Sequence, residues 1–383
     1  MSAYLDHNAT TPPHDDVLAA MADAARTAWA NPSSLHQRGR AARARIEDAR
    51  LAIAALAGVS ERDVLFTSGG TEANNLGLER PFSANAGLLV TSRLEHPSVV
   101  AKAEELADRG VRVLWLPVHP DGHLRPDDVI SALDQRKPGE PCLVAVGAVH
   151  HETGAIQPIA AIVTLVDARK ADLHVDAVQA AGRVPPACWR GAHTIALAAH
   201  KLRGPKGIGA LACRAGVQVR PILRGGAQER GLRPGTVDPV AAAGFEVAAR
   251  RALDGPDRYA LLGPLRDRLE AGALAAAAQH GGSLTLTGVE PRAPHVAHLV
   301  VDGWAGDELV AALDLEGVCV SSGSACTAGT AEASPALVAM VGARARGALR
   351  ATLGETSTEA DVDAFLAAFS RVLARAPYLS PAP

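Results

Sequence analysis

Aromatic side chains are scarce in this chain of 383 residues, since phenylalanine, tryptophan and tyrosine together make up only 3%. Proteins that bind single-stranded nucleic acid stack bases on aromatic rings, so this scarcity argues against such a surface. An excess of positive charge is also missing, because the formal net charge is −3 and the isoelectric point is about 6.5. A nucleic-acid backbone is bound by a basic patch, and we therefore expect no nucleic-acid partner.

Long apolar runs and a leader pattern are absent as well. No window approaches 18 uninterrupted apolar residues, and the first residues lack the basic and apolar pattern of a signal peptide. The cysteines are odd in number and include no Cys-x-x-Cys pair: Cys142, Cys188, Cys213, Cys319 and Cys326. The sequence thus predicts a cytoplasmic protein with reduced cysteines, no membrane contact and no bound metal.

Short apolar runs are what the chain has in quantity, and between residues 64 and 212 seven of them alternate with helix-length segments. This alternation predicts an α/β fold with a mostly parallel seven-stranded sheet covered by helices on both faces. Ligands of such sheets lie beyond the carboxyl ends of the strands, so polar residues that follow the strands should share one crevice. The predicted strands are 64–67, 87–91, 111–115, 142–146, 172–175, 194–197 and 208–212.

The length of the chain predicts two domains, because one core rarely accommodates so many residues. Helical patterns cover 13–28, 37–57 and 239–279, the last with an interruption near Asp254. Beyond residue 282 strands and helices alternate more sparsely, which is typical of a smaller α+β domain. We expect a large domain over 13–256 and a small domain built from 1–12 and 257–383.

Two residues at predicted strand ends, Lys201 and Asp176, indicate the chemistry. A lysine that follows a buried strand is partly dehydrated, and dehydration favours the neutral, nucleophilic amine. An acid in the same position stays ionised when it has a partner. A Schiff-base lysine and an acid beside the pyridine nitrogen are the two groups by which proteins use pyridoxal 5′-phosphate (PLP). Taken alone, each residue is more often an ordinary surface lysine or a strand-end acid, and only the combination with the motifs below favours the cofactor.

Two further motifs suit the same cofactor. Residues 67–75 (TSGGTEANN) follow a predicted strand and open a helix, which makes Gly70 and Thr71 candidate phosphate binders. The alternative for this motif is a plain helix cap. His96 lies at another strand end, where it either stacks on a flat cofactor and relays protons or is an ordinary core histidine.

Cys326 and Arg350 are candidates for substrate chemistry. Cys326 lies in a run of small residues, 320–331 (VSSGSACTAGTA), which predicts an accessible loop and therefore a usable thiol. Arg350 lies within an alternating strand pattern, where its planar fork suits a substrate carboxylate. An incidental loop cysteine and a structural ion pair are the alternatives.

Taken together, these motifs resemble the cysteine desulfurases of the aminotransferase class-V group, which are PLP enzymes of fold type I. The resemblance runs nearly end to end. The run after Cys326 resembles the branch with an extended cysteine loop, which serves iron–sulfur cluster assembly and tRNA thiolation. The matching segments are 4–12 (YLDHNATTP), 31–36 (NPSSLH), 67–72 (TSGGTE), 151–158 (HETGAIQP), 174–179 (HVDAVQ), 200–201 (HK), 225–236 (GGAQERGLRPGT) and 322–326 (SGSAC).

The resemblance implies a role for each matching residue in binding the cofactor. Lys201 carries PLP as a Schiff base and later moves the substrate's α-proton, and Asp176 pairs with the pyridine nitrogen. Gln179 bonds the ring hydroxyl and His96 stacks on the ring. The phosphate is held by Gly70, Thr71 and His200, together with Thr236 of the neighbouring subunit, which implies a homodimer with shared active sites.

The resemblance also implies the reaction, in which Arg350 and Asn8 bind the substrate L-cysteine. Cys326 attacks the substrate sulfur and becomes a persulfide, and alanine is released. An acceptor protein then takes the sulfur.

The chain departs from the family pattern at three places. His151 stands near the ring hydroxyl where the family usually has asparagine, Ala198 replaces a serine on the phosphate, and residues 331–334 read AEAS instead of LEPS. These departures keep a selenocysteine lyase or a specialised biosynthetic C–S lyase open as the alternative. A scaffold without efficient catalysis and a Cys–His hydrolase are two further alternatives; the first disagrees with the intact Lys201, Asp176 and Cys326, and the second leaves Lys201 and Asp176 unexplained.

Overall fold

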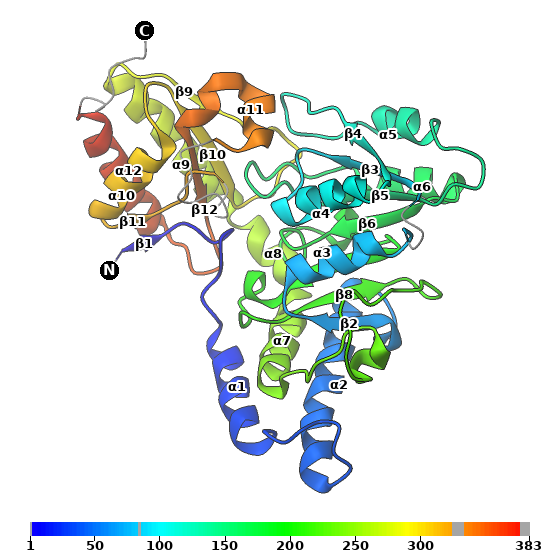
Figure 1. The fold of residues 1–383 in the computed structure, drawn as a ribbon. Coiled ribbons are helices and arrows are strands. Elements are labelled where there is room, and N and C mark those ends of the chain that lie inside the picture. Colours follow the sequence, from blue (N-terminus) through cyan, green and yellow to red (C-terminus); the bar gives the residue numbers. More distant parts are fainter. Residues whose placement is uncertain (1, 83–85, 324–332, 376–383) are drawn as a thin grey trace.

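The computed structural model describes residues 2–82, 86–323 and 333–375, and a seven-stranded sheet forms its centre (Figure 1). The strand order is β2-β8-β7-β6-β5-β3-β4; five strands run parallel, and β8 is antiparallel to its neighbours β2 and β7. The predicted α/β fold is confirmed, and each strand lies within one residue of its predicted bounds. The strands are β2 (Val64–Thr67), β3 (Leu88–Ser92), β4 (Arg112–Leu116), β5 (Cys142–Gly147), β6 (Asp172–Asp176), β7 (Thr194–Ala198) and β8 (Gly209–Cys213).

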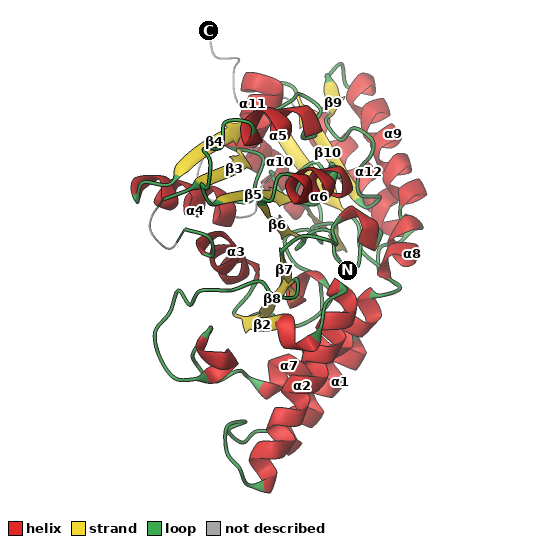
Figure 2. Cartoon of the chain, turned by 90° about the vertical axis from the view of Figure 1, so that its right-hand side faces the viewer, coloured by secondary structure: helices red, strands yellow, loops and turns green. Residues whose placement is uncertain are grey.

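Both faces of this sheet are buried, as the near-continuous apolar runs predict. On β3, Leu88 and Val90 belong to one hydrophobic cluster while Leu89, between them, belongs to another on the opposite face. Two helices, α3 and α4, cover the second face, and the others cover the first (Figures 1 and 2). The helices are α1 (Asp15–Thr27), α2 (Gln37–Ala57), α3 (Gly70–Glu79), α4 (Pro97–Asp108), α5 (Pro126–Leu133), α6 (Ile159–Ala168) and α7 (Pro239–Ala252).

A second, smaller group of elements lies beside the large sheet and includes both the first strand and the last helix of the described chain (Figure 1). Its three-stranded antiparallel sheet has the order β12-β10-β9, and β1 (Ala3–Tyr4) pairs in parallel with β11 (Val318–Cys319). The domain boundary at residue 256 stays a prediction. The remaining elements are α8 (Gly255–Ala260), α9 (Gly263–Gln279), β9 (Leu284–Leu286), β10 (Val296–Val301), α10 (Gly306–Leu315), α11 (Pro335–Val341), β12 (Ala348–Thr352) and α12 (Glu359–Leu373).

Three of the cysteines lie in strands. Cys142 and Cys213 are buried in β5 and β8, and Cys319 lies in β11. Over the described ranges, no helix combines the length and the apolar character needed to span a membrane. The same part of the chain contains no cluster of three or more histidine, cysteine or acidic side chains arranged to hold a metal ion.

The smaller core depends on a pair of aromatic rings in α12. Phe365 is fully buried, and its ring stacks on Phe369 with 5.4 Å between centroids. Phe365→Ala should lower the free energy of unfolding by about 3–5 kcal/mol, because it leaves a cavity the neighbours cannot fill. Leu315→Ala is the control, since Leu315 is 85% exposed and its loss should cost no more than about 0.5 kcal/mol. Urea unfolding followed by circular dichroism measures both; equal losses would contradict the assigned core.

Candidate active site

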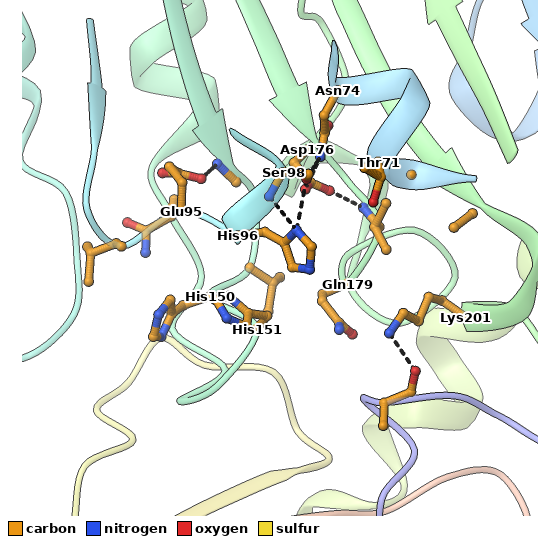
Figure 3. A pocket seen from close by; sticks show the side chains of 18 of the residues that line it. Thr71, Asn74, Glu95, His96, Ser98, His150, His151, Asp176, Gln179 and Lys201 are labelled. Carbon is orange, nitrogen blue, oxygen red and sulfur yellow. Dashed lines mark hydrogen bonds between the residues drawn. The ribbon is translucent and has the colours of Figure 1, made fainter. Parts of the chain in front are cut away.

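A pocket of about 230 Å³ lies at the carboxyl ends of the parallel strands (Figure 3). The predicted crevice is therefore present, although Thr67, which was expected there, does not line it. Residues from the ends of four strands and from the start of α3 converge on it. Those named in the sequence analysis are Gly70, Thr71, His96, His151, Asp176, Gln179, Ala198, His200 and Lys201.

Asp176, the last residue of β6, is held by two hydrogen bonds. Its Oδ1 accepts from the backbone nitrogen of Val178 at 2.9 Å, and its Oδ2 accepts from Nδ2 of Asn74 at 2.7 Å. Both donors are neutral, and Asp176 forms no ion pair within the described part of the chain that meets the 4.0 Å limit of a salt bridge. The carboxylate is thus fixed in direction without a cation beside it, which leaves its charge to act on whatever occupies the pocket.

Lys201 ends the short turn Ala199–Lys201 that follows β7. Its Nζ donates to the backbone oxygen of Asn8 and, at 2.8 Å, to that of Ala9. The backbone oxygen of Lys201 accepts from Nη2 of Arg183 at 3.0 Å. The amine therefore reaches from the large sheet to the first residues of the chain, at the edge of the pocket (Figure 3).

His96 caps the N-terminus of α4 and presents its ring to the pocket (Figure 3). Its Nδ1 accepts from the backbone nitrogen of Ser98 at 3.1 Å and lies 2.8 Å from Oγ of Ser98. Because Nδ1 is an acceptor, Nε2 carries the hydrogen in the neutral ring. The cap fixes the plane of the imidazole, which is what a group that stacks on a flat ligand requires.

The N-terminus of α3 forms one end of the pocket, where Gly70 and Thr71 expose unpaired backbone amides of the first helical turn. Gly70 packs so closely that a Cβ there would stand 2.7 Å from Cγ2 of Val178. His200 also lines the pocket, and burial together with the nearby Lys201 charge lowers its pKa to about 4. This end is a neutral, donor-rich site that suits a phosphate.

His151 lies on the wall of the pocket, with its ring edge-on to His96 and His150. Burial, followed by the neighbouring His150 and His96, holds its pKa well below 6.5. Burial also lowers the pKa of His150 to about 4. Both rings are consequently neutral at physiological pH and act as hydrogen-bond groups.

Gln179 and Asn8 are joined by a fully buried arginine. Nη1 of Arg183 donates to Oδ1 of Asn8 at 2.7 Å and to Oε1 of Gln179. Nε2 of Gln179 in turn donates to the backbone oxygen of Asn8 at 3.0 Å. Gln179 lines the pocket, whereas the side chain of Asn8 is already bonded to Arg183 and His295 and does not line it.

Three predicted site residues lie elsewhere or outside the described residues. Arg350 is 2% exposed, does not line the pocket, and donates to Oδ1 of Asp6 and to the backbone oxygen of His151, each at 3.0 Å. Thr236 is exposed in the segment before α7 and is also absent from the lining. Cys326 lies in 324–332, outside the described residues.

The structure adds three residues to which sequence reasoning gave no role: Asn74, Ser98 and Glu95. Glu95 is buried, and burial and the charge of Asp176 raise its pKa to about 8, although it accepts a hydrogen bond from the backbone of Gly147. Asn74 carries the clearest missed signal, because it is a polar residue on the apolar face of a helix, between Ala73 and Leu76.

The fold and the pocket define a fold-type I α/β protein with a lysine and an acid at the carboxyl ends of a mostly parallel sheet. Residues 3–365 match the aminotransferase class-V family, and the chain belongs to it.

Curated relatives and solved structures agree with this family assignment. The chain is 41% identical to the IscS-like cysteine desulfurase of Mycobacterium tuberculosis over 387 aligned positions, which cover 98% of this chain and 97% of the relative. It is 38% identical to a cysteine desulfurase of Cereibacter sphaeroides, with coverages of 99% and 97%. A solved NifS-like protein superposes with a TM-score of 0.87 at 30% identity, over 97% of this chain and 99% of that one.

Glu95 couples the stability of the fold to pH. Its carboxyl ionises near 4.5 in the unfolded chain and near 8 in the folded one, so between these values the folded chain binds the extra proton. The free energy of unfolding therefore falls as pH rises across this window. Glu95→Gln removes the titration. It should melt close to the wild type at pH 5 and at a higher temperature than the wild type at pH 8.5.

Thermal melts of the cofactor-free protein, followed by circular dichroism, measure this effect. Glu104→Gln is the control, since Glu104 lies exposed on the same side of the sheet in α4 and should give the same difference from wild type at both pH values. Identical melting of Glu95→Gln and wild type at pH 8.5 would show that Glu95 is ionised in the fold without cost.

Proposed function

We propose that this chain is a PLP-dependent cysteine desulfurase, which converts L-cysteine to L-alanine and carries the sulfur as a persulfide on Cys326. The observation that carries the proposal is the convergence of Lys201, Asp176 and His96 on one pocket in a chain of this family. The curated relatives named above are cysteine desulfurases and share the whole length of the chain.

The groups in the pocket fit PLP. An amine, an anionic carboxylate with neutral donors, a capped imidazole and a helix N-terminus correspond to its aldehyde, ring nitrogen, ring face and phosphate. When bound, the cofactor supplies an electron sink that stabilises a carbanion at the substrate's α-carbon. We assign the ring hydroxyl to Gln179 and His151, and the phosphate to Gly70, Thr71 and His200.

The residues of the chain then divide the work. Asp176 keeps a proton on the ring nitrogen by its charge, and His96 holds the ring from one face. Lys201 holds the cofactor and, once released by the substrate, carries the α-proton. Arg350 and Asn8 bind the substrate carboxylate; for Arg350 this means exchanging Asp6, its present partner, for the substrate.

Cys326 is the nucleophile for sulfur. Its thiolate attacks the sulfur of the bound cysteine, an S–S bond forms, and the C–S bond breaks. A proton delivered to the β-carbon, and the return of the α-proton, complete alanine. An acceptor protein takes the outer sulfur for cluster assembly or thiolation, and we place the reaction in a cytoplasmic homodimer in which Thr236 reaches the partner's phosphate.

Selenocysteine lyase, or a specialised C–S lyase, is the second candidate. The observation in its favour is that His151 and Ala198, two of the three departures from the family pattern, both line the pocket. Turnover of cysteine, selenocysteine and cystine by the purified protein separates the two candidates. A preference for selenocysteine of more than about tenfold in kcat/KM would favour the second.

Lys201→Ala and Cys326→Ala should fail in different ways. The first removes the amine that holds the cofactor, so the absorbance band of the lysine-bound cofactor should disappear together with activity. The second keeps that band and loses sulfide release by at least about 10³-fold, because no thiolate accepts the sulfur. Absorbance spectra with alanine and sulfide assays measure both.

Cys188→Ala is the control, since Cys188 is half-buried at the end of the short turn Pro186–Cys188, does not line the pocket, and its loss should leave full activity. Sulfide release at the wild-type rate by Cys326→Ala would refute the role of that residue, and a colourless wild-type protein after incubation with PLP would refute the function.

A further inference from the structure

Asn74 occupies a junction of buried hydrogen bonds behind the pocket. Its side chain is 1% exposed, and both hydrogens of Nδ2 as well as Oδ1 take part in hydrogen bonds. Nδ2 donates to Oδ2 of Asp176 at 2.7 Å and to Oγ of Ser98 at 2.8 Å. Oδ1 lies 3.0 Å from Nε2 of His174. One amide thus contacts three side chains, those of Asp176 and His174 on β6 and of Ser98 on α4.

The direction of each bond follows from the acceptor that Asp176 provides. A carboxylate only accepts, so Nδ2 and not Oδ1 of Asn74 must face it. Oδ1 therefore accepts from His174, which must carry its hydrogen on Nε2. Nδ1 of His174 is then an acceptor for the hydroxyl of Thr194, at 2.9 Å. A single orientation runs from Thr194 on β7, through His174, to Asn74.

The same reasoning reaches His96. Because Oγ of Ser98 accepts from Asn74, its own hydrogen is available for Nδ1 of His96, 2.8 Å away (Figure 3). The junction thus connects the two groups assigned to the ring of the cofactor, its acid partner Asp176 and its stacking partner His96.

Helix α3 packs closely against His174, one of the residues of this junction. Gly77 lies one turn beyond Asn74 on α3, and a Cβ there would stand 2.3 Å from Nδ1 of His174. Burial lowers the pKa of His174 to about 4, so the ring is neutral. Thr194, His174, Asn74 and Ser98 therefore form a chain of neutral groups.

We propose that Asn74 is a positioning residue, through which the buried pair His174 and Thr194 sets the orientation of both Asp176 and His96. The inference rests on the proposed function, since it concerns the groups assigned to PLP. A neutral amide suits the task because it directs the carboxylate without adding a cation that would compete with the ring nitrogen for its charge.

Thr194→Val tests the proposal at a residue that does not line the pocket. The change keeps the volume of the side chain and removes the hydroxyl, so Nδ1 of His174 loses its donor. The imidazole hydrogen can then move to Nδ1, which sets the bare Nε2 against Oδ1 of Asn74. We expect about tenfold weaker PLP binding and a shifted absorbance maximum of the bound cofactor.

Thr91→Val is the matched control. Thr91 is also fully buried in the central sheet, and its hydroxyl also makes one hydrogen bond, to the backbone oxygen of Ala145 at 2.8 Å. It has no bond to the junction. Both variants should lower the melting temperature of the cofactor-free protein by similar amounts, but only Thr194→Val should change the affinity for PLP and the absorbance maximum.

Two variants within the junction test separately its connection to His96, through Ser98, and its connection to Asp176. Ser98→Ala removes the bonds of Oγ to both Asn74 and His96 but leaves the bonds of Asn74 to Asp176 and His174. Asn74→Asp places a second carboxylate against Asp176, so it should weaken PLP binding by about a hundredfold. Should Asn74→Asp not fold, the comparison of Thr194→Val with Thr91→Val decides alone.

Thr194→Val with wild-type affinity and absorbance would overturn the inference, whatever its melting temperature, because Asn74 would then be structural only. The same holds if Thr91→Val changes the spectrum as much. A wild-type protein that shows no band of lysine-bound PLP would instead overturn the proposed function, so the two failures are distinguishable.

Discussion

The arrangement of the molecule depends on the burial of one sheet from both sides. Parallel strands present their carboxyl ends at the same edge, and the helices that cover the faces leave this edge open. The polar residues that follow β3, β5, β6 and β7 therefore lie together at this open edge. The pocket is thus a consequence of the sheet, and its residues come from segments as distant in sequence as Gly70 and Lys201.

Within that pocket the charges are few and separated. The buried histidines His150, His151 and His174 are neutral, because burial disfavours their charged forms. Glu95 retains its proton up to about pH 8 for the same reason. Asp176 and Lys201, the acid and the amine assigned to the cofactor, thus lie among groups that are neutral. A low local dielectric makes the influence of each on a bound ring larger than it would be in water.

Sequence patterns predicted the strands well because each is a short apolar run. A strand that is buried on both faces requires only such a run of apolar residues, without a particular residue at any position. Lys201 and Asp176 were predictable for a related reason, since a charge at the end of such a run is conspicuous. Asn74 was not, because its meaning depends on His174, a hundred residues away, and on Ser98 in another helix. The present pairing of Arg350 with Asp6 also joins distant segments, and no local pattern announces it.

His151 shows how a departure from a family pattern can preserve the physics of a site. An imidazole in place of an amide introduces a group that can be charged, but here it lies against His150 and His96, with Arg350 and Lys201 also raising the cost of a positive charge. The ring therefore stays neutral over the physiological range. A neutral imidazole offers one donor and one acceptor in fixed directions, so like an amide it can both donate and accept. The substitution changes the shape of the side chain and therefore the fit of the ligand, but it leaves the net charge of the pocket unchanged.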